Sequence, residues 1–161
     1  MTNRNPHLGA EGTRCSIGRA LEVFGDRWSL LILREALQGA TRFSDFRDRL
    51  QVASDVLTHR LGTLVEGGVL DRLPYQEAGS RTRMAYRLTP AGQDLMVVFG
   101  ALQQWGDQYC PHPDGPLVGR VSRTDGQALH VAFVDEQGHE TPLRDVDLGG
   151  PVDAAAARRE T

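Results

Sequence analysis

Apolar residues recur with helical spacing in the first part of the chain. The first series covers residues 17–24, where apolar side chains fall at i, i+3, i+4 and i+7, and Gly25 ends it. The second covers about residues 26–37 and is apolar on most sides, which is typical of a helix at the centre of a core. Gly39 provides a stop signal. The pattern therefore predicts a short amphipathic helix followed by a buried one.

Two further helices are predicted on either side of the turn at residues 51–53. The third helix is defined by Phe43, Phe46 and Leu50, and Ser44 is its candidate N-cap. Ser54 is the candidate N-cap of the fourth helix, which Gly67-Gly68 terminates. One face of the fourth helix is apolar, while its other face is polar. The apolar face consists of Leu57, Leu61, Leu64 and Val65.

The pattern then changes from helical spacing to strands. Residues 69–75 and 83–88 are strand-like, and the loop at 76–82 is long enough to project from a hairpin. Three helices followed by such a hairpin are the elements of a winged helix. Thr89 and Pro90 then begin a helix that is predicted to continue to about Tyr109, roughly 30 Å in length. This helix is longer than the core of so small a domain requires.

The last third of the chain has a different pattern. After a Pro- and Gly-rich breaker at 111–116, strand-like runs near 117–123, 128–135 and 139–148 predict a three-stranded meander. The predicted fold class is therefore α+β: a winged helix-turn-helix with a long C-terminal dimerisation helix and a small β extension. The predicted organisation is a flexible arm at 1–14, a DNA-binding and dimerisation domain at 15–110, a β extension at 117–148 and a disordered tail at 149–161.

Charge is unevenly distributed along the chain. The net charge is −3, but residues 1–110 carry 13 Arg against 12 acidic residues, and the remaining residues carry 5 Arg against 9. The acidity belongs to the end of the chain, so the overall sign does not argue against nucleic-acid binding by the first part. No run approaches the ~18 apolar residues of a membrane span, and the start lacks a signal-peptide pattern. The sequence thus predicts a cytoplasmic protein without membrane contact.

Signatures of catalysis are missing from the sequence. There is no nucleophile elbow, no Gly-rich phosphate loop and no pair of histidines at metal-ligand spacing. Cys110 and His112 are two potential ligands, and two ligands do not make a metal site. The two cysteines are too far apart in sequence to suggest a disulfide framework or a zinc site. We therefore predict that the protein is not an enzyme and needs no cofactor or metal.

The polar face of the fourth helix is the candidate for reading DNA. A helix of this size fits the major groove, and residues near its start face the base edges. The candidates there are Ser54, Asp55, Thr58 and His59. Further DNA-binding candidates lie around the third helix, where arginines could contact the phosphate backbone, and at the hairpin loop, where arginines could contact phosphates or enter the minor groove. They are Arg42, Ser44, Arg47, Arg81 and Arg83. The alternative is that both sets are ordinary solvated surface, and Arg27 and Arg34 are interpreted as intramolecular partners of Asp26 or Glu35.

Several ordered motifs resemble the HxlR family of bacterial regulators over roughly residues 13–108. They follow Cys15 and comprise residues 26–28, 31–35, 42–46, 54–61, 68–72 and 86–92. The resemblance implies a homodimer that regulates nearby genes, with an interface formed by the first helix and the long C-terminal helix. The interface candidates are Ile17, Leu21, Phe24, Leu95, Phe99, Leu102 and Trp105.

The resemblance also implies that Cys15 can sense oxidants or electrophiles. A helix N-terminus and neighbouring arginines favour a thiolate, whereas the alternative is an inert, buried cysteine. The predicted function is a sequence-specific DNA-binding transcriptional regulator, a homodimer on a pseudo-palindromic operator, with Cys15 as a redox-responsive group. Two alternatives stay open: a winged-helix protein-interaction module, and a regulator that responds to a small ligand without thiol chemistry.

Overall fold

The computed structural model describes residues 15–76, 79, 81–116 and 118–148, so the predicted arm at 1–14 and tail at 149–161 lie outside the described residues. The chain divides into two compact units, one ending at Phe99 and the other beginning at Gly100. Each unit is described by itself below.

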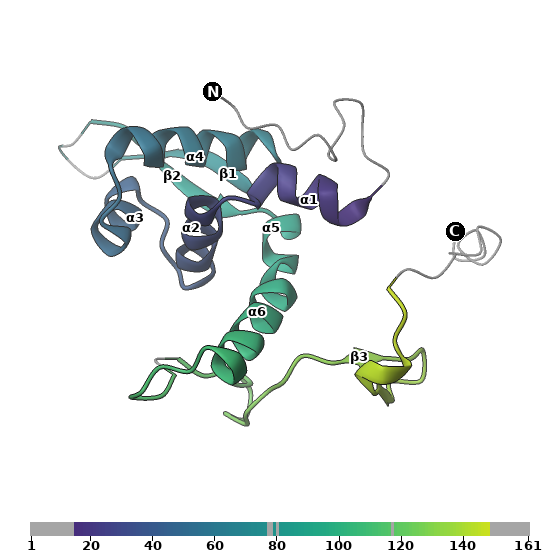
Figure 1. Cartoon of the computed structure of the whole chain (residues 1–161). Helices are drawn as coiled ribbons and strands as arrows, with labels where there is room; N and C mark the ends of the chain where they lie inside the picture. The colour runs from purple at the N-terminus through teal and green to yellow at the C-terminus, as the bar shows by residue number, and fades with distance from the viewer. Residues whose placement is uncertain (1–14, 77–78, 80, 117, 149–161) are drawn as a thin grey trace. The chain divides into compact units, whose positions relative to one another are not determined.

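Four helices open the first unit: α1 (Ser16–Phe24), α2 (Arg27–Leu37), α3 (Phe43–Leu50) and α4 (Ser54–Glu66) (Figure 1). Their bounds agree with the predicted helices to within about two residues. Asp26 caps α2, because its Oδ1 accepts the backbone N–H groups of Trp28 and Ser29 at 3.0 and 3.1 Å. Gly39 has a φ of 91°, which suits the chain reversal after α2.

The predicted N-caps of α3 and α4 are wrong. The N-cap position of α3 is Arg42 rather than Ser44, and the Asp45 carboxylate satisfies the start of the helix by accepting the backbone N–H groups of Thr41 and Arg42. Ser54 is already the first helical residue of α4, so the cap position falls on Ala53, whose side chain has no acceptor. The turn between the helices is one residue shorter than the cap assignment required.

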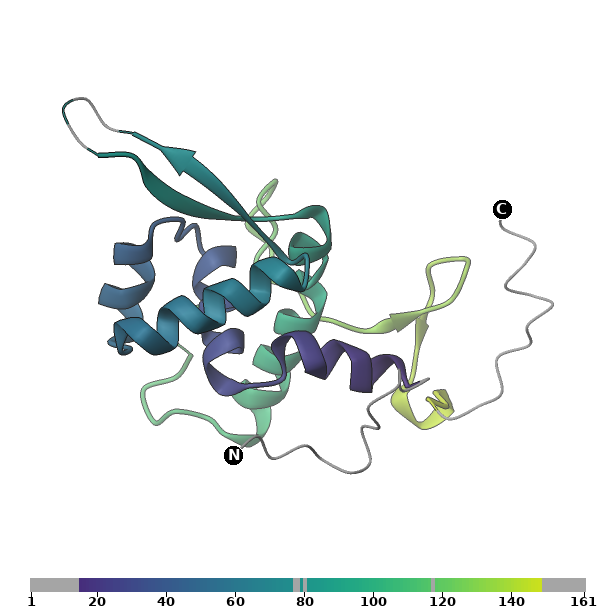
Figure 2. The same ribbon diagram turned by 90° about the horizontal axis from the view of Figure 1, so that it is seen from above.

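An antiparallel hairpin follows α4. Strand β1 (Leu70–Tyr75) pairs with β2 (Arg83–Leu88), with Leu70 opposite Leu88 and Tyr75 opposite Arg83. Both strands were predicted, and Figure 2 shows them extending past the helices as a wing. Residue 42 adds a bridge on the other side of β2, opposite Ala85. The helices and the hairpin together form the winged helix-turn-helix that the sequence predicted.

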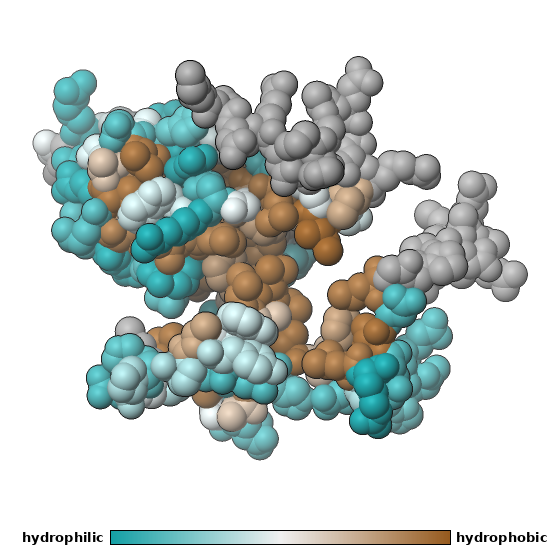
Figure 3. Space-filling model, in the orientation of Figure 1, coloured by the Kyte–Doolittle hydropathy of each residue, from teal (hydrophilic) through white to brown (hydrophobic). Residues whose placement is uncertain are grey.

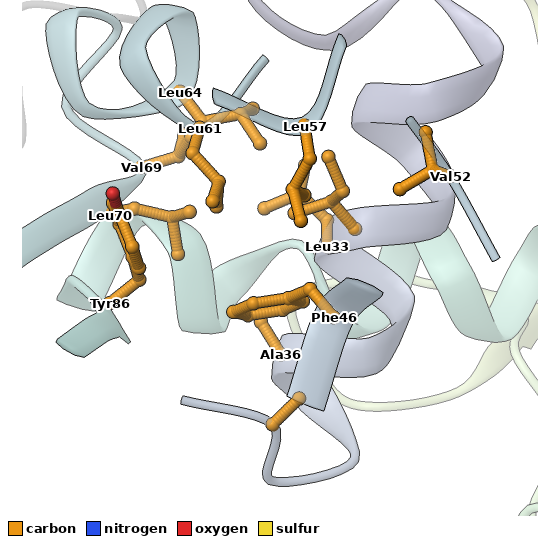
Figure 4. Packing of buried hydrophobic residues seen from close by; sticks show 12 residues of the cluster. Leu33, Ala36, Phe46, Val52, Leu57, Leu61, Leu64, Val69, Leu70 and Tyr86 are labelled. Carbon is orange, nitrogen blue, oxygen red and sulfur yellow. The ribbon is translucent and has the colours of Figure 1, made fainter. Parts of the chain in front are cut away.

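The hydrophobic core lies where α2, α3, α4 and the hairpin meet (Figure 4). Leu57, Leu61 and Leu64 of α4 are fully buried, as the pattern predicted, and Phe46 of α3 meets Tyr86 of β2 edge to face with ring centroids 6.4 Å apart. This packing fixes α4 on the body of the domain by its inner face and leaves its outer face to solvent.

A short helix joins the hairpin to a longer one. α5 (Pro90–Asp94) begins at Thr89, whose Oγ1 accepts the Gly92 N–H at 3.0 Å, and Pro90 occupies the first helical position as predicted. α6 (Met96–Tyr109) follows. The prediction of one continuous helix from 90 to 109 is corrected at Leu95, which separates the two helices while keeping right-handed helical backbone angles.

The second unit contains little regular structure. Strands β3 (Phe133–Val134) and β4 (Glu140–Thr141) form one pair, an isolated bridge joins Val121 to Ala128, and residues 143–145 form a 3-10 turn. The predicted three-stranded meander is therefore wrong in extent. None of the described residues from 100 to 148 is buried, so the apolar core that would hold long strands together is missing from this part.

Hydrogen bonds to helix side chains organise the second unit instead. The Gln104 side chain donates to the Val131 carbonyl at 3.0 Å and accepts the Val131 N–H at 2.8 Å, as a neighbouring strand would. Arg120 pairs with Asp107, with Nη1 and Oδ2 at 2.8 Å. These contacts fix the extension to the C-terminal part of α6.

Candidate nucleic-acid interface

The turn between α3 and α4 aligns the outer face of α4. Gln51 adopts a left-handed conformation with φ 50°, and Val52 is buried in the core at 6% exposure. The turn is therefore fixed by packing as well as by backbone geometry. With Leu57, Leu61 and Leu64 buried on the inner face, the opposite side of α4 is presented to solvent as a rigid surface.

All four predicted base-reading residues lie on that exposed side. Ser54, Asp55, Thr58 and His59 are each exposed. The Thr58 hydroxyl donates to the Ser54 carbonyl at 2.7 Å, which uses its hydrogen and leaves its oxygen lone pairs to accept. The surface thus offers a hydroxyl acceptor, a carboxylate and an imidazole, which are groups that can bond to base edges in a major groove.

An ion pair connects α4 to the start of α2. Arg60 Nε lies 3.2 Å from Oδ1 of Asp26, the same oxygen that caps α2. Partial burial acts to raise the pKa of Asp26, but hydrogen bonds from Ser29, the charge of Arg60 and the Trp28 N–H together outweigh it, so the pKa lies below its ordinary value. The charged form of Asp26 therefore stabilises the position of α4.

A buried carboxylate connects α2 to α3. Glu35 is 5% exposed, and its Oε1 accepts the Arg34 Nε–H at 2.9 Å while Oε2 faces Nη1 of Arg49 at 3.4 Å. The interpretation of Arg34 as a partner of Glu35 is confirmed. Arg27 instead lies over the Trp28 ring, 5.6 Å from its centroid. The helix-turn-helix is thus tied to α2 at both of its helices.

The predicted phosphate-contacting residues are also exposed. They are Arg42, Ser44, Arg47, Arg81 and Arg83. Arg47 faces Asp48 at 3.2 Å, but both side chains are more than half exposed, so the pair is screened by water and salt. The Arg42 guanidinium lies 5.0 Å from the ring centroid of Tyr75 on the wing. Tyr75 could not be recognised from the sequence, because its partner comes from a different element and an aromatic residue at a strand end is a weak signal.

Cys15 lies at the N-cap of α1. Its side chain is exposed, which contradicts the alternative of a buried cysteine, and its Sγ accepts the Gly18 N–H at 3.4 Å. Cys110 is exposed as well. Across the described part of the chain, no group of three or more His, Cys, Asp or Glu side chains is arranged to hold a metal ion.

Two helices leave apolar side chains uncovered. On α1, Ile17 is 66% and Leu21 47% exposed, and on α6, Leu102 is 52% and Trp105 58% exposed. Apolar residues gather along α6 in Figure 3. The remaining interface candidates pack in part against the core cluster; they are Phe24, Leu95 and Phe99. None of the described helices has the length and apolar character needed to cross a membrane.

Comparisons with known proteins agree with this architecture. A family model described as HxlR-like helix-turn-helix matches residues 23–114. An HTH-type transcriptional regulator of Mycobacterium tuberculosis is 46% identical over 132 residues, which cover 81% of this chain and 82% of the relative.

Two solved structures extend the comparison. PA1607, described as a candidate transcription factor, superposes with a TM-score of 0.75 and 35% identity, over 89% of this chain and 98% of that one. The redox regulator HypR in its oxidised form superposes with a TM-score of 0.52 and 25% identity, over 58% and 96% of the two chains. The match to PA1607 covers so much of the chain that it includes residues of the second unit. The chain belongs to the HxlR-like helix-turn-helix family of transcriptional regulators.

Proposed function

We propose that the protein regulates transcription by binding duplex DNA sequence-specifically, with α4 in the major groove and the wing along the backbone. The observation that carries this proposal is the construction of α4. Its inner face is fully buried and its outer face is an exposed row of polar side chains, held by Arg60 on one side and by the α3 turn on the other. A helix fixed in this way can present side chains to base edges without reorganising.

The proposed contacts divide into two classes. Ser54, Asp55, Thr58 and His59 would contact bases and set sequence preference. The cationic and hydroxyl side chains of α3 and the wing would contact phosphates and fix the register of the protein on the duplex. These are Arg42, Ser44, Arg47, Arg81 and Arg83. We propose no catalytic role for any of these residues. We place the protein in the cytoplasm, because chromosomal DNA lies there.

A mobility-shift titration tests the proposal. The probes are the DNA upstream of the protein's own gene and a shuffled duplex of the same length and base composition. We expect the upstream DNA to be retained at protein concentrations at which the shuffled duplex stays unbound, because specific binding is typically at least about a thousandfold tighter. A protein-interaction module that kept the fold would retain neither probe, and that outcome would contradict the proposal.

We further propose a homodimer on a pseudo-palindromic operator. The exposed apolar residues Ile17 and Leu21 of α1 and Leu102 and Trp105 of α6 support it, since monomers rarely expose such rows. A two-fold dimer would bind half-sites about 34 Å apart. Light scattering of Leu102→Glu should report a monomer, whereas Leu143→Glu, a control at a 77% exposed residue of the extension, should not change the mass. A wild-type monomer at micromolar concentration would contradict the dimer.

We propose Cys15 as an oxidant-responsive group. Its exposed Sγ at the start of α1, facing a backbone N–H, and the likeness of the chain to a redox regulator support this role. Attack of the thiolate on hydrogen peroxide forms an S–O bond, breaks the O–O bond and releases hydroxide, so that sulfur loses the two electrons that the peroxide gains. Cys15→Ser should abolish the effect of peroxide on DNA binding, and Cys110→Ser should leave it intact. If Cys15→Ser responds like the wild type, Cys15 is not the responsive group. If the wild type does not respond to peroxide at all, the small-ligand alternative replaces thiol sensing.

A further inference from the structure

A single β-bridge joins the residue before α3 to the two-stranded ladder of the wing. β2 lies in the middle, with β1 on one side and residue 42 on the other. Arg42 is opposite Ala85, and Tyr75 is opposite Arg83. Directly paired residues, and residues two apart on one strand, point to the same face of a sheet. The side chains of all four residues therefore lie on one face of the ladder.

Arg42 reaches across the middle strand on that face. Its guanidinium carbon lies 5.0 Å from the centroid of the Tyr75 ring, although the two residues are on opposite sides of β2. Between them β2 carries Ala85, which is only 8% exposed, and a methyl group leaves room for a long side chain to pass. A guanidinium within about 6 Å of an aromatic face is attracted by the ring quadrupole. The Tyr75 ring thus determines where the charge of Arg42 is held.

The register of the hairpin places a second arginine on the same face. Arg83 is directly across the ladder from Tyr75, on the same face, and it is exposed. Within the part of the chain that the structure describes, Arg83 makes no ion pair. Two guanidinium groups on one face can bind a single anion between them, because their forked donors match the oxygens of a phosphate.

We propose that Tyr75 is a positioning residue that holds Arg42 beside Arg83, so that one arginine from the helix-turn-helix and one from the wing bind a single phosphate of the DNA backbone. The inference rests on the proposed DNA binding and adds to it a shared phosphate site. Such a site fixes the wing relative to α3 when DNA is bound, because neither arginine can move along the backbone without the other.

Salt-dependent titrations of the upstream duplex test this site. Tyr75→Leu removes the ring face and keeps a similar bulk, and Tyr75→Ile does so with a better strand former. Both should bind DNA about five- to tenfold more weakly at low salt and make the slope of log affinity against log salt shallower by about one contact. Tyr75→Phe, which keeps the ring, should behave as the wild type. Arg27→Ala is the matched control, because Arg27 also lies over an aromatic ring but away from the wing.

A double variant separates positioning from a merely structural role. If Tyr75 acts through Arg42, then Arg42→Ala combined with Tyr75→Leu should bind no more weakly than Arg42→Ala alone. Additive losses, or a slope unchanged in folded Tyr75→Leu and Tyr75→Ile, would overturn the shared phosphate site and leave the DNA-binding function intact. A wild-type protein that binds neither duplex would instead overturn the proposed function itself.

Discussion

Replacing Gly92 by alanine should destabilise the protein, because the steric clash costs more free energy than the higher helix propensity of alanine gains. A Cβ at this position would lie 2.1 Å from the Val69 carbonyl oxygen and 3.0 Å from a methyl group of Leu88. Ordinary contact begins at 3.4 Å, so the start of α5 and the segment before β1 must separate by more than 1 Å. The obstacle is backbone, which cannot rotate away as the end of a side chain can.

The cost can be worked out from what this separation disturbs. Overpacking of this kind costs about 1–3 kcal/mol. The Thr89 hydroxyl donates to the Gly68 carbonyl at 2.7 Å and the Thr89 N–H to the Val69 carbonyl at 3.2 Å, and weakening these bonds adds about 1 kcal/mol each. The gain from alanine in a helix is at most about 1 kcal/mol. We therefore expect a net loss of about 2–4 kcal/mol, or a fall in Tm of roughly 10 °C.

Urea and thermal unfolding followed by circular dichroism measure this loss. Gly62→Ala is the matched control, since Gly62 is helical, lies in the same unit, and a Cβ added there would meet no neighbouring group within 4 Å. It should leave the protein unchanged or stabilise it by up to about 1 kcal/mol. If Gly92→Ala proves as stable as Gly62→Ala, that result would contradict the close contact between Gly92 of α5 and the backbone of Val69.

Four further substitutions test the interface and its supports. Asp26→Asn should destabilise the protein at pH 7, and the difference from the wild type should shrink as the pH falls below 3.8. The folded pKa of Asp26 is lowered, so its stabilisation is present above the unfolded value of 3.8 and is lost as the pH falls through the folded value, which a series of urea unfolding curves at decreasing pH will show. Glu35→Gln should cost about 1–3 kcal/mol in the same assay, because a buried carboxylate between two arginines loses its charge. His59→Ala should cost about 1–3 kcal/mol of binding free energy on operator DNA and nothing on random DNA, whereas Arg81→Ala should weaken binding to both and make the salt slope shallower by about one. Titrations on both duplexes separate the two effects, and equal losses of affinity for His59→Ala on the two duplexes would contradict base contact.

Much of the fold could be predicted because local pattern and tertiary packing agree in the first unit. The leucines of α4 recur at helical spacing and are buried together, and the hairpin strands are bounded by strong turn signals. The cap assignments failed for a local reason. A serine near a helix start is a good cap only if the helix begins one residue later, and pattern alone does not fix a boundary to one residue. At α3 the Asp45 side chain, three residues after the cap position, satisfies the backbone N–H of Arg42 instead.

The extension and the Arg42 contact could not be predicted, because neither is determined locally. The pattern in the extension suggested long strands, but among its described residues only the short β3–β4 pair forms, and side chains of α6 bond to the backbone carbonyls of Val118 and Val131. The approach of Arg42 to Tyr75 depends on the ladder that residue 42 joins, and no spacing in the sequence reveals that bridge. The candidate site was predictable as a set of exposed residues, while its internal geometry was not.

Selection from a random duplex library tests the central claim most directly. The full-length protein is incubated with the library at physiological salt, bound duplexes are recovered and sequenced, and the recovered consensus is titrated by fluorescence anisotropy. We predict a two-fold symmetric motif with half-sites about one helical turn apart, bound at least about a thousandfold more tightly than random DNA, with one or two positions of each half-site relaxed by His59→Ala. Recovery of no motif after repeated rounds, or a motif bound no better than random DNA, would contradict the account.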